Sequence, residues 1–253
     1  MVLDDQAPFN GVPRKLGCYE GTGAAQDSVR YQEIWDLHSI LLLEHFQFAH
    51  PFGSVRRYAE MLVKFSREYF NAKWIDNSMT AFGCLPDLYK KRMTWLDPFR
   101  LGVLVAIMMN DQEGVHEITS WINGEFSRDE LDYTQADIDY YVVLGKYLNQ
   151  GVLQKFLIDS IKNRRRKRPK YLTEMLEALA QKDSKRFAAF FIEYHKLFDK
   201  NECDKDAFLL FKNVNINGSI LWNLAKLRGL EIPEFSENIM DRIITPQSIG
   251  LDE

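Results

Sequence analysis

The histidines are the side chains of this chain whose type and spacing first suggest metal chemistry. Three of the five, His38, His45 and His50, fall close together. A metal site on one helix face needs ligands three or four residues apart, as in the HExxH zinc motif. His38 and His45 are seven residues apart, so they lie two turns apart without the close pair that makes such motifs specific. We therefore interpret these side chains as core or partly buried histidines and predict no metal site.

No other arrangement of reactive side chains matches a known catalytic pattern. The chain has no GxSxG nucleophile motif, no DxDxDG calcium loop and no phosphate-binding glycine loop. Its three cysteines, Cys18, Cys84 and Cys203, lie far apart, and a sparse odd number is typical of a reducing compartment. We predict a cytoplasmic protein that is not an enzyme and needs no cofactor; an enzyme with dispersed catalytic residues is the alternative.

A run of cations between Lys162 and Lys170 is the most conspicuous charged feature. It carries seven positive charges, whereas the whole chain has a net charge of −4. Such side chains can contact phosphates or an acidic partner, but no nucleic-acid-binding fold pattern accompanies them. We favour a solvated helix C-terminus whose cations complement the helix dipole and which Pro169 stops. The contact residues in the other interpretation are Arg164, Arg165, Arg166, Lys167 and Arg168.

An acidic stretch with tyrosines, residues 125–141, is the second candidate for contacting a partner. Tyrosine is a preferred interface residue, and carboxylates around aromatic anchors suit a basic partner. An exposed loop followed by a capped helix explains the same pattern equally well. The residues assigned to partner binding are Glu125, Asp129, Glu130, Asp132, Tyr133, Asp137, Tyr140 and Tyr141.

Helices must position these side chains, because apolar residues recur every three to four positions from residue 27 onward. No segment alternates at period two beside a hairpin turn, so no strand is predicted. In the helix after Gly151, Phe156 is grouped with Leu153, Leu157 and Ile161 on the apolar face. The predicted helices lie at about 27–50, 54–69, 87–93, 97–109, 111–122, 134–148, 151–161, 170–181, 184–199, 204–212, 218–228 and 236–244.

A weak internal repeat relates two of the predicted helix pairs. Leu104–Asp111 (LVAIMMND) aligns with Leu176–Asp183 (LEALAQKD) at an offset of 72 residues, about twice the period of a helix-hairpin repeat. Ala106 and Ala178 would allow close helix approach, and each aspartate would cap the following helix. Chance similarity between two amphipathic hairpins is the alternative, and both explanations predict stacked α-hairpins.

The domain organisation follows from where the helical pattern begins. Glycines and prolines interrupt residues 1–26, which we predict to be an irregular N-terminal arm. Residues 27–253 are predicted to form one all-α domain of about ten helices stacked as antiparallel hairpins. No apolar run approaches the roughly 18–20 residues of a membrane span, and the first residues lack the features of a secretory signal. We expect no membrane association.

Four stretches resemble a family of bacterial proteins. They are Tyr58–Phe70 (YAEMLVKFSREYF), the hairpins Leu101–Ile122 and Leu172–Phe198, and Gly218–Ile232 (GSILWNLAKLRGLEI). Together they are similar to immunity protein 49 and to the related helical immunity proteins that guard against PoNe-type DNase toxins of polymorphic toxin systems. The resemblance covers most of residues 30–245. It implies a cytoplasmic, non-enzymatic antitoxin that neutralises one cognate toxin through a surface, so no single functional residue is transferred.

Three functions therefore compete. The first is an immunity protein that binds and neutralises a toxin effector by protein–protein interaction. The second is a helical-repeat scaffold or adaptor that holds a peptide in a concave groove. The third, less favoured because the rest of the chain is acidic, is a nucleic-acid-binding protein that uses residues 162–170.

Overall fold

The computed structural model describes residues 56–57, 59–64, 66–67, 96–120, 135–201 and 214–251. These residues are mostly helical and include no strand, so the predicted all-α fold is confirmed for them. The predicted arm 1–26 and the predicted helices at 27–50, 87–93 and 204–212 lie outside the described residues. The helices are α5 (Leu96–Met108), α6 (Gln112–Ser120), α7 (Gln135–Gln150), α8 (Lys155–Lys162), α9 (Lys167–Ala180), α10 (Ser184–Asn201), α11 (Ile216–Leu227) and α12 (Glu237–Met240), followed by the 3-10 helix η4 (Gln247–Ile249).

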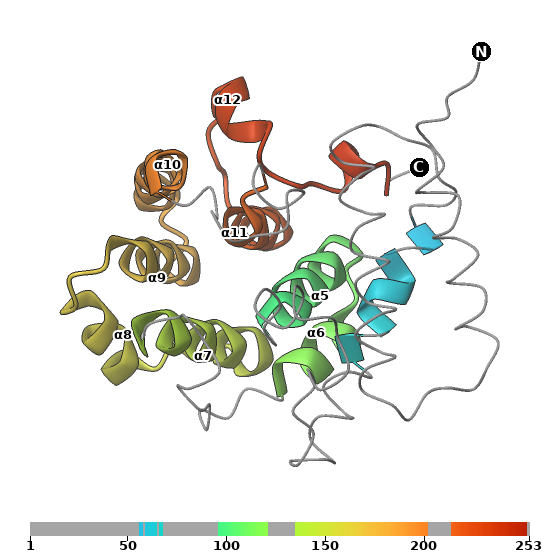
Figure 1. Ribbon diagram of the computed structural model, residues 1–253, viewed down its shortest axis with the longest axis horizontal. Helices are drawn as coiled ribbons and strands as arrows, with labels where there is room; N and C mark the ends of the chain where they lie inside the picture. The colour runs from blue at the N-terminus through green and yellow to red at the C-terminus, as the bar shows by residue number, and fades with distance from the viewer. Residues whose placement is uncertain are drawn as a thin grey trace, which may run out of the picture.

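Consecutive helices pack against one another along most of the described chain. α5 packs on α6, α6 on α7, α7 on α8, α8 on α9 and α9 on α10. This succession agrees in outline with the predicted stack of α-hairpins, since short connections make sequential helices neighbours. α11 departs from the succession, because it lies between the α5 and α9 ends of the stack (Figure 1).

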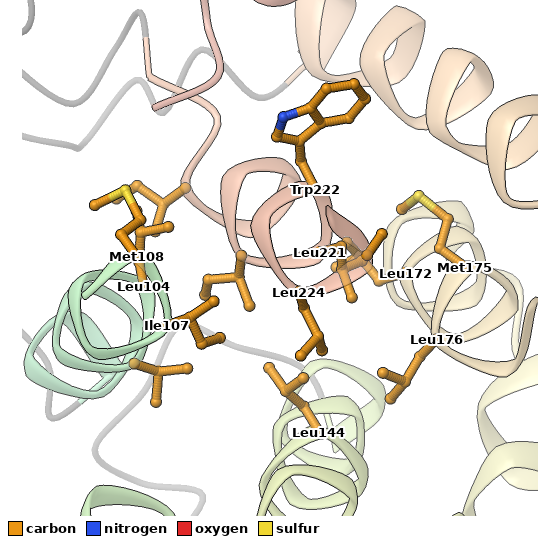
Figure 2. Close-up of a cluster of buried hydrophobic side chains, with 14 of the residues drawn as sticks. Leu104, Ile107, Met108, Leu144, Leu172, Met175, Leu176, Leu221, Trp222 and Leu224 are labelled. Atoms are coloured by element: carbon orange, nitrogen blue, oxygen red, sulfur yellow. The ribbon is translucent and has the colours of Figure 1, made fainter. Parts of the chain in front are cut away.

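α11 is the central helix of the core. Every residue from Ile216 to Ala225 is buried, because α5, α9 and α10 contact it. Trp222 on its far side contacts Phe191 of α10, with the ring centroids 5.9 Å apart. Figure 2 shows apolar side chains of α5, α7 and α9 converging on Leu221 and Leu224 of α11: Leu104, Ile107, Met108, Leu144, Leu172, Met175 and Leu176.

Buried polar side chains of α11 hold the C-terminal segment in place. Asn223 donates to the carbonyl oxygen of Ile244 at 2.7 Å, and the Ile244 amide donates to the Ser219 hydroxyl at 2.9 Å. Buried polar groups of this kind are stable only when hydrogen-bonded, so these contacts specify where the segment lies. Ile243 and Ile244 are thereby buried against the core.

The predicted repeat corresponds to two turns with matching backbone geometry. Asn110 and Lys182 both adopt left-handed backbone conformations, with φ of 55° and 57°. In each turn the next amide donates 2.8 Å to the carbonyl of the alanine five residues earlier, from Asp111 to Ala106 and from Asp183 to Ala178. This is the Schellman pattern that satisfies the last carbonyls of a helix.

The aspartates of the repeat cap the following helices as predicted. The Asp111 carboxylate accepts from the Gly114 amide at 2.8 Å, and the Asp183 carboxylate accepts from the Arg186 amide at 3.0 Å. Each bond satisfies one of the orphan amides at a helix N-terminus. The two hairpins α5–α6 and α9–α10 therefore have the same turn geometry and the same type of aspartate cap.

Pro169 occupies a different place from the one predicted. α9 begins at Lys167, so Pro169 lies in its first turn and does not end the preceding helix. Proline is tolerated there because the first amides of a helix have no intrahelical acceptor. The prediction that Pro169 acts as a helix stop is wrong, and the cationic run spans the end of α8, a turn and the start of α9.

Candidate functional site

The two charged segments found in the sequence contact each other in the fold. Arg168 of α9 donates from Nε to the Asp137 carboxylate at 3.0 Å, and Arg166 lies 3.9 Å from the same group. Arg164 lies 3.4 Å from Asp139. Both aspartates are buried near the start of α7, where a carboxylate also complements the helix dipole. Part of the cationic run therefore neutralises α7 instead of facing a partner.

The prediction that the acidic and aromatic side chains of residues 125–141 contact a partner is wrong for the three assigned residues that the structure describes. Asp137, Tyr140 and Tyr141 are all buried, so a partner cannot reach their side chains in this fold. Every residue of α7 from Ala136 to Gly145 is buried, so this stretch has no exposed face, and the sequence pattern did not distinguish it from a capped surface helix. The other residues assigned to that surface lie outside the described residues: Glu125, Asp129, Glu130, Asp132 and Tyr133.

The two tyrosines of α7 are structural side chains. Their rings meet edge to face, with centroids 5.1 Å apart, and the Tyr141 hydroxyl donates to Asn217 Oδ1 of α11 at 3.0 Å. Burial raises the pKa of both phenols, because the phenolate would lose its hydration. Both rings therefore stay neutral and connect α7 to the core.

A second charge network joins α8, α9 and α10. Glu174 and Glu177 of α9 bind Arg186 of α10, which lies 2.9 Å from Glu177, and both also pair with Lys162 at the end of α8. Burial opposes ionisation of Glu174, but the hydrogen bond from Arg186 and the charge of Lys162 outweigh it and lower its pKa. The network fixes α8, α9 and α10 relative to one another.

Arg165 and Lys167 differ from the other cations of the run. Both side chains are exposed, and neither forms an ion pair with any other residue in the described part of the chain. Lys155, at the start of α8, is likewise exposed and has no ion pair there. These side chains have charge available for another molecule.

The sequence did not identify Phe156 as an exposed residue. It was grouped with the apolar face of its helix, but its side chain is 71% exposed, and Val152 in the preceding turn is 52% exposed. The signal lay in the helical period: Ile158 and Ile161 face the core, and Phe156 is more than a third of a turn away from both. We call Val152, Phe156, Arg165 and Lys167 the α8 patch.

The described ranges contain neither a candidate metal site nor a membrane-spanning helix. No group of three or more His, Cys, Asp or Glu side chains there could hold a metal ion, and His38, His45 and His50 lie outside those ranges. No helix in these ranges is long and apolar enough to cross a membrane. His116 is exposed on α6, whereas His195 is buried on α10 beside Phe198.

The chain was compared with protein-family models, curated proteins and solved structures, and none of the three comparisons gives a match.

Proposed function

We propose that this chain is an immunity protein: it binds a cognate bacterial toxin in the cytoplasm and neutralises it by contact alone. The observation that carries the protein-binding part is the exposure of Phe156 beside Val152 on a helix whose other face is fixed in the core. A large aromatic side chain held in water on a rigid element is the type of residue that dominates protein interfaces.

The toxin as partner rests on the resemblance of the four quoted stretches to helical immunity proteins. Three of those stretches fall largely within α5–α6, α9–α10 and α11, which form the described core. The family inhibits through surfaces, and a rigid stack of hairpins supports that mode, because little conformational entropy is lost when a pre-ordered surface binds.

A scaffold or adaptor function is the second candidate. It is supported by the duplicated turn and cap of α5–α6 and α9–α10, since repeated hairpins build extended binding surfaces in solenoid proteins. The central position of α11 argues against an open solenoid, because this helix contacts both α5 and α9 and closes the stack. We therefore favour the immunity function over the scaffold function.

Co-expression with the product of the adjacent upstream gene tests the immunity function. The neighbour alone is expected to arrest growth, and the pair is expected to restore survival and to co-purify as a stable complex. An unrelated toxin of the same activity class serves as the control and should still kill cells that carry this chain. A harmless neighbour, or a toxic one that neither binds nor is neutralised, would overturn the proposal.

A further inference from the structure

The α8 patch combines apolar and basic side chains that the fold leaves accessible. Only three large hydrophobic side chains in the described ranges are strongly exposed, and two of them, Val152 and Phe156, lie four residues apart. Leu227, the third, is at the end of α11. Leaving a phenyl side chain in water forgoes the favourable free energy of burying it, which a partner could recover.

The fold holds Phe156 in a fixed position. Ile158 and Ile161 anchor α8 in the core, and the helix packs against α7 and α9. Lys162 binds Glu174 and Glu177, which fixes the end of α8 to α9. Because the backbone at Phe156 is already ordered, binding restricts only the rotamers of its side chain.

The charge balance next to Phe156 is positive. Arg164, Arg166 and Arg168 are paired with Asp137 and Asp139, as described above. Among residues 155–168, the cations left without an ion pair in the described ranges are Lys155, Arg165 and Lys167, and α8 carries one exposed carboxylate, Asp159. A complementary surface is therefore acidic.

The apolar and basic parts of the patch lie close enough to serve one interface. α8 has eight residues and is thus ~12 Å long at ~1.5 Å per residue. Arg165 follows the last residue of α8 by three positions and Lys167 begins α9, so both come just after a short helix whose first turn carries Phe156. A standard interface buries about 800 Å² on each partner, which spans this distance.

We infer that the α8 patch docks an acidic protein surface, in which Phe156 enters an apolar pocket and Arg165 and Lys167 pair with carboxylates around it. The inference rests on the proposed function in that the toxin would supply this surface, and it goes further by naming the docking residues and the charge of the partner.

The same side chains favour a protein over a nucleic acid. Four of the seven cations of the run form ion pairs within the fold, so few remain to contact phosphates. Each cation–phosphate contact contributes to the affinity for a nucleic acid through counterion release. The aliphatic Val152 and the carboxylate of Asp159 add nothing to a phosphate-binding surface. Nucleic acid is therefore an outcome to be tested and not the occupant proposed.

Direct binding to defined polymers tests the patch independently of any toxin. The probes are a random glutamate–tyrosine copolymer, polyglutamate and a single-stranded DNA oligonucleotide of similar charge, at about 50 mM and about 300 mM salt. The variants are Phe156→Ala and the double charge reversal Arg165→Glu with Lys167→Glu. The matched controls are Leu227→Ala, another exposed apolar truncation, and Lys185→Glu, an exposed charge reversal on α10.

The chain is expected to bind the glutamate–tyrosine copolymer more tightly than polyglutamate or DNA. Each patch variant should weaken this binding about tenfold or more, while each control stays within about twofold. No binding to the copolymer, an equal loss in the controls, or a preference for DNA that the charge reversal abolishes would overturn the inference.

The co-expression experiment with the upstream gene distinguishes failure of the α8 patch from failure of the immunity function. A toxin that is neutralised equally well by both patch variants would remove the α8 patch as its docking surface and leave the immunity function standing. A neighbour that never binds would remove the immunity function, while copolymer binding lost in the patch variants would still support an acidic partner.

Discussion

Tyr140 and Tyr141 of α7 are adjacent and both buried, yet their hydroxyls differ in hydrogen bonding within the described part of the chain. Tyr141 donates to Asn217, whereas the Tyr140 hydroxyl has no hydrogen-bond partner among the described residues. Tyr141→Phe would leave the Asn217 oxygen buried without a donor, so it should lower the free energy of unfolding by about 1–2 kcal/mol. Tyr140→Phe removes a polar atom that gains nothing from burial and should be neutral or stabilising. Urea unfolding of both variants measures the difference; equal destabilisation would contradict it.

Glu174 makes the stability of the fold depend on pH in the acidic range. Its pKa is lowered from the usual 4.5, because Arg186 and Lys162 outweigh the effect of burial. The folded state therefore binds the proton less readily than the unfolded state, and the stabilisation is present above about pH 4.5 and lost as the pH falls below it. Glu174→Gln should lower stability at pH 7 by about 1–3 kcal/mol and flatten the acid dependence. Denaturant midpoints at pH 7 and pH 3.5 test this, with the exposed Glu231→Gln as control.

The sequence shows which residues are charged but not which of them pair. The acidic segment and the cationic run looked like two interaction surfaces because pairing between them joins residues 31 apart, as in Arg168 and Asp137. Periodicity records only which side of its own helix a residue occupies. It cannot reveal that the first turn of α7 faces the start of α9, so the burial of Asp137 was not foreseeable.

Helix ends were more predictable than helix contacts, because a cap is local. Asp111 and Asp183 both cap the following helix where the sequence predicts. The orientation of the short helix α8 was not predictable in the same way. With eight residues it completes about two turns, and four apolar side chains within it could not be divided into core and surface by period alone.

The duplicated turn predicts a stabilising substitution. Lys182 has φ of 57°, a conformation that costs a residue with a Cβ roughly 1 kcal/mol and costs glycine almost nothing. Lys182→Gly should therefore raise the free energy of unfolding by about 0.5–1 kcal/mol. In the middle of α10, Lys196→Gly should lower it by about 1 kcal/mol. Thermal and urea unfolding of the two variants compare them; a loss of stability for Lys182→Gly would mean that this turn is not left-handed.

The arrangement of helices depends on a contact that no local pattern contains. α11 lies against α5 although more than 100 residues separate them in the chain. The sequence predicted both helices but placed them in a linear succession of hairpins, because short connections are the only topological information that a single sequence offers. The closing contact comes from the all-round burial of α11, which contains the leucines and isoleucines of a buried helix and also three buried polar side chains, Asn217, Ser219 and Asn223.

If α11 closes the stack, the two duplicated hairpins should unfold as one unit and not one after the other. Leu221 is fully buried and points into the cluster that α5, α7 and α9 share (Figure 2). Leu221→Ala should cost about 2–5 kcal/mol and should accelerate hydrogen exchange in α5 and α9 by the same factor. Ile158→Ala is the matched control, because Ile158 is buried in α8 at the edge and should release α8 with little effect on α5. Faster exchange in α9 without a change in α5 after Leu221→Ala would instead show that each hairpin is stable alone, as in an open solenoid, and would move the scaffold ahead of the immunity protein.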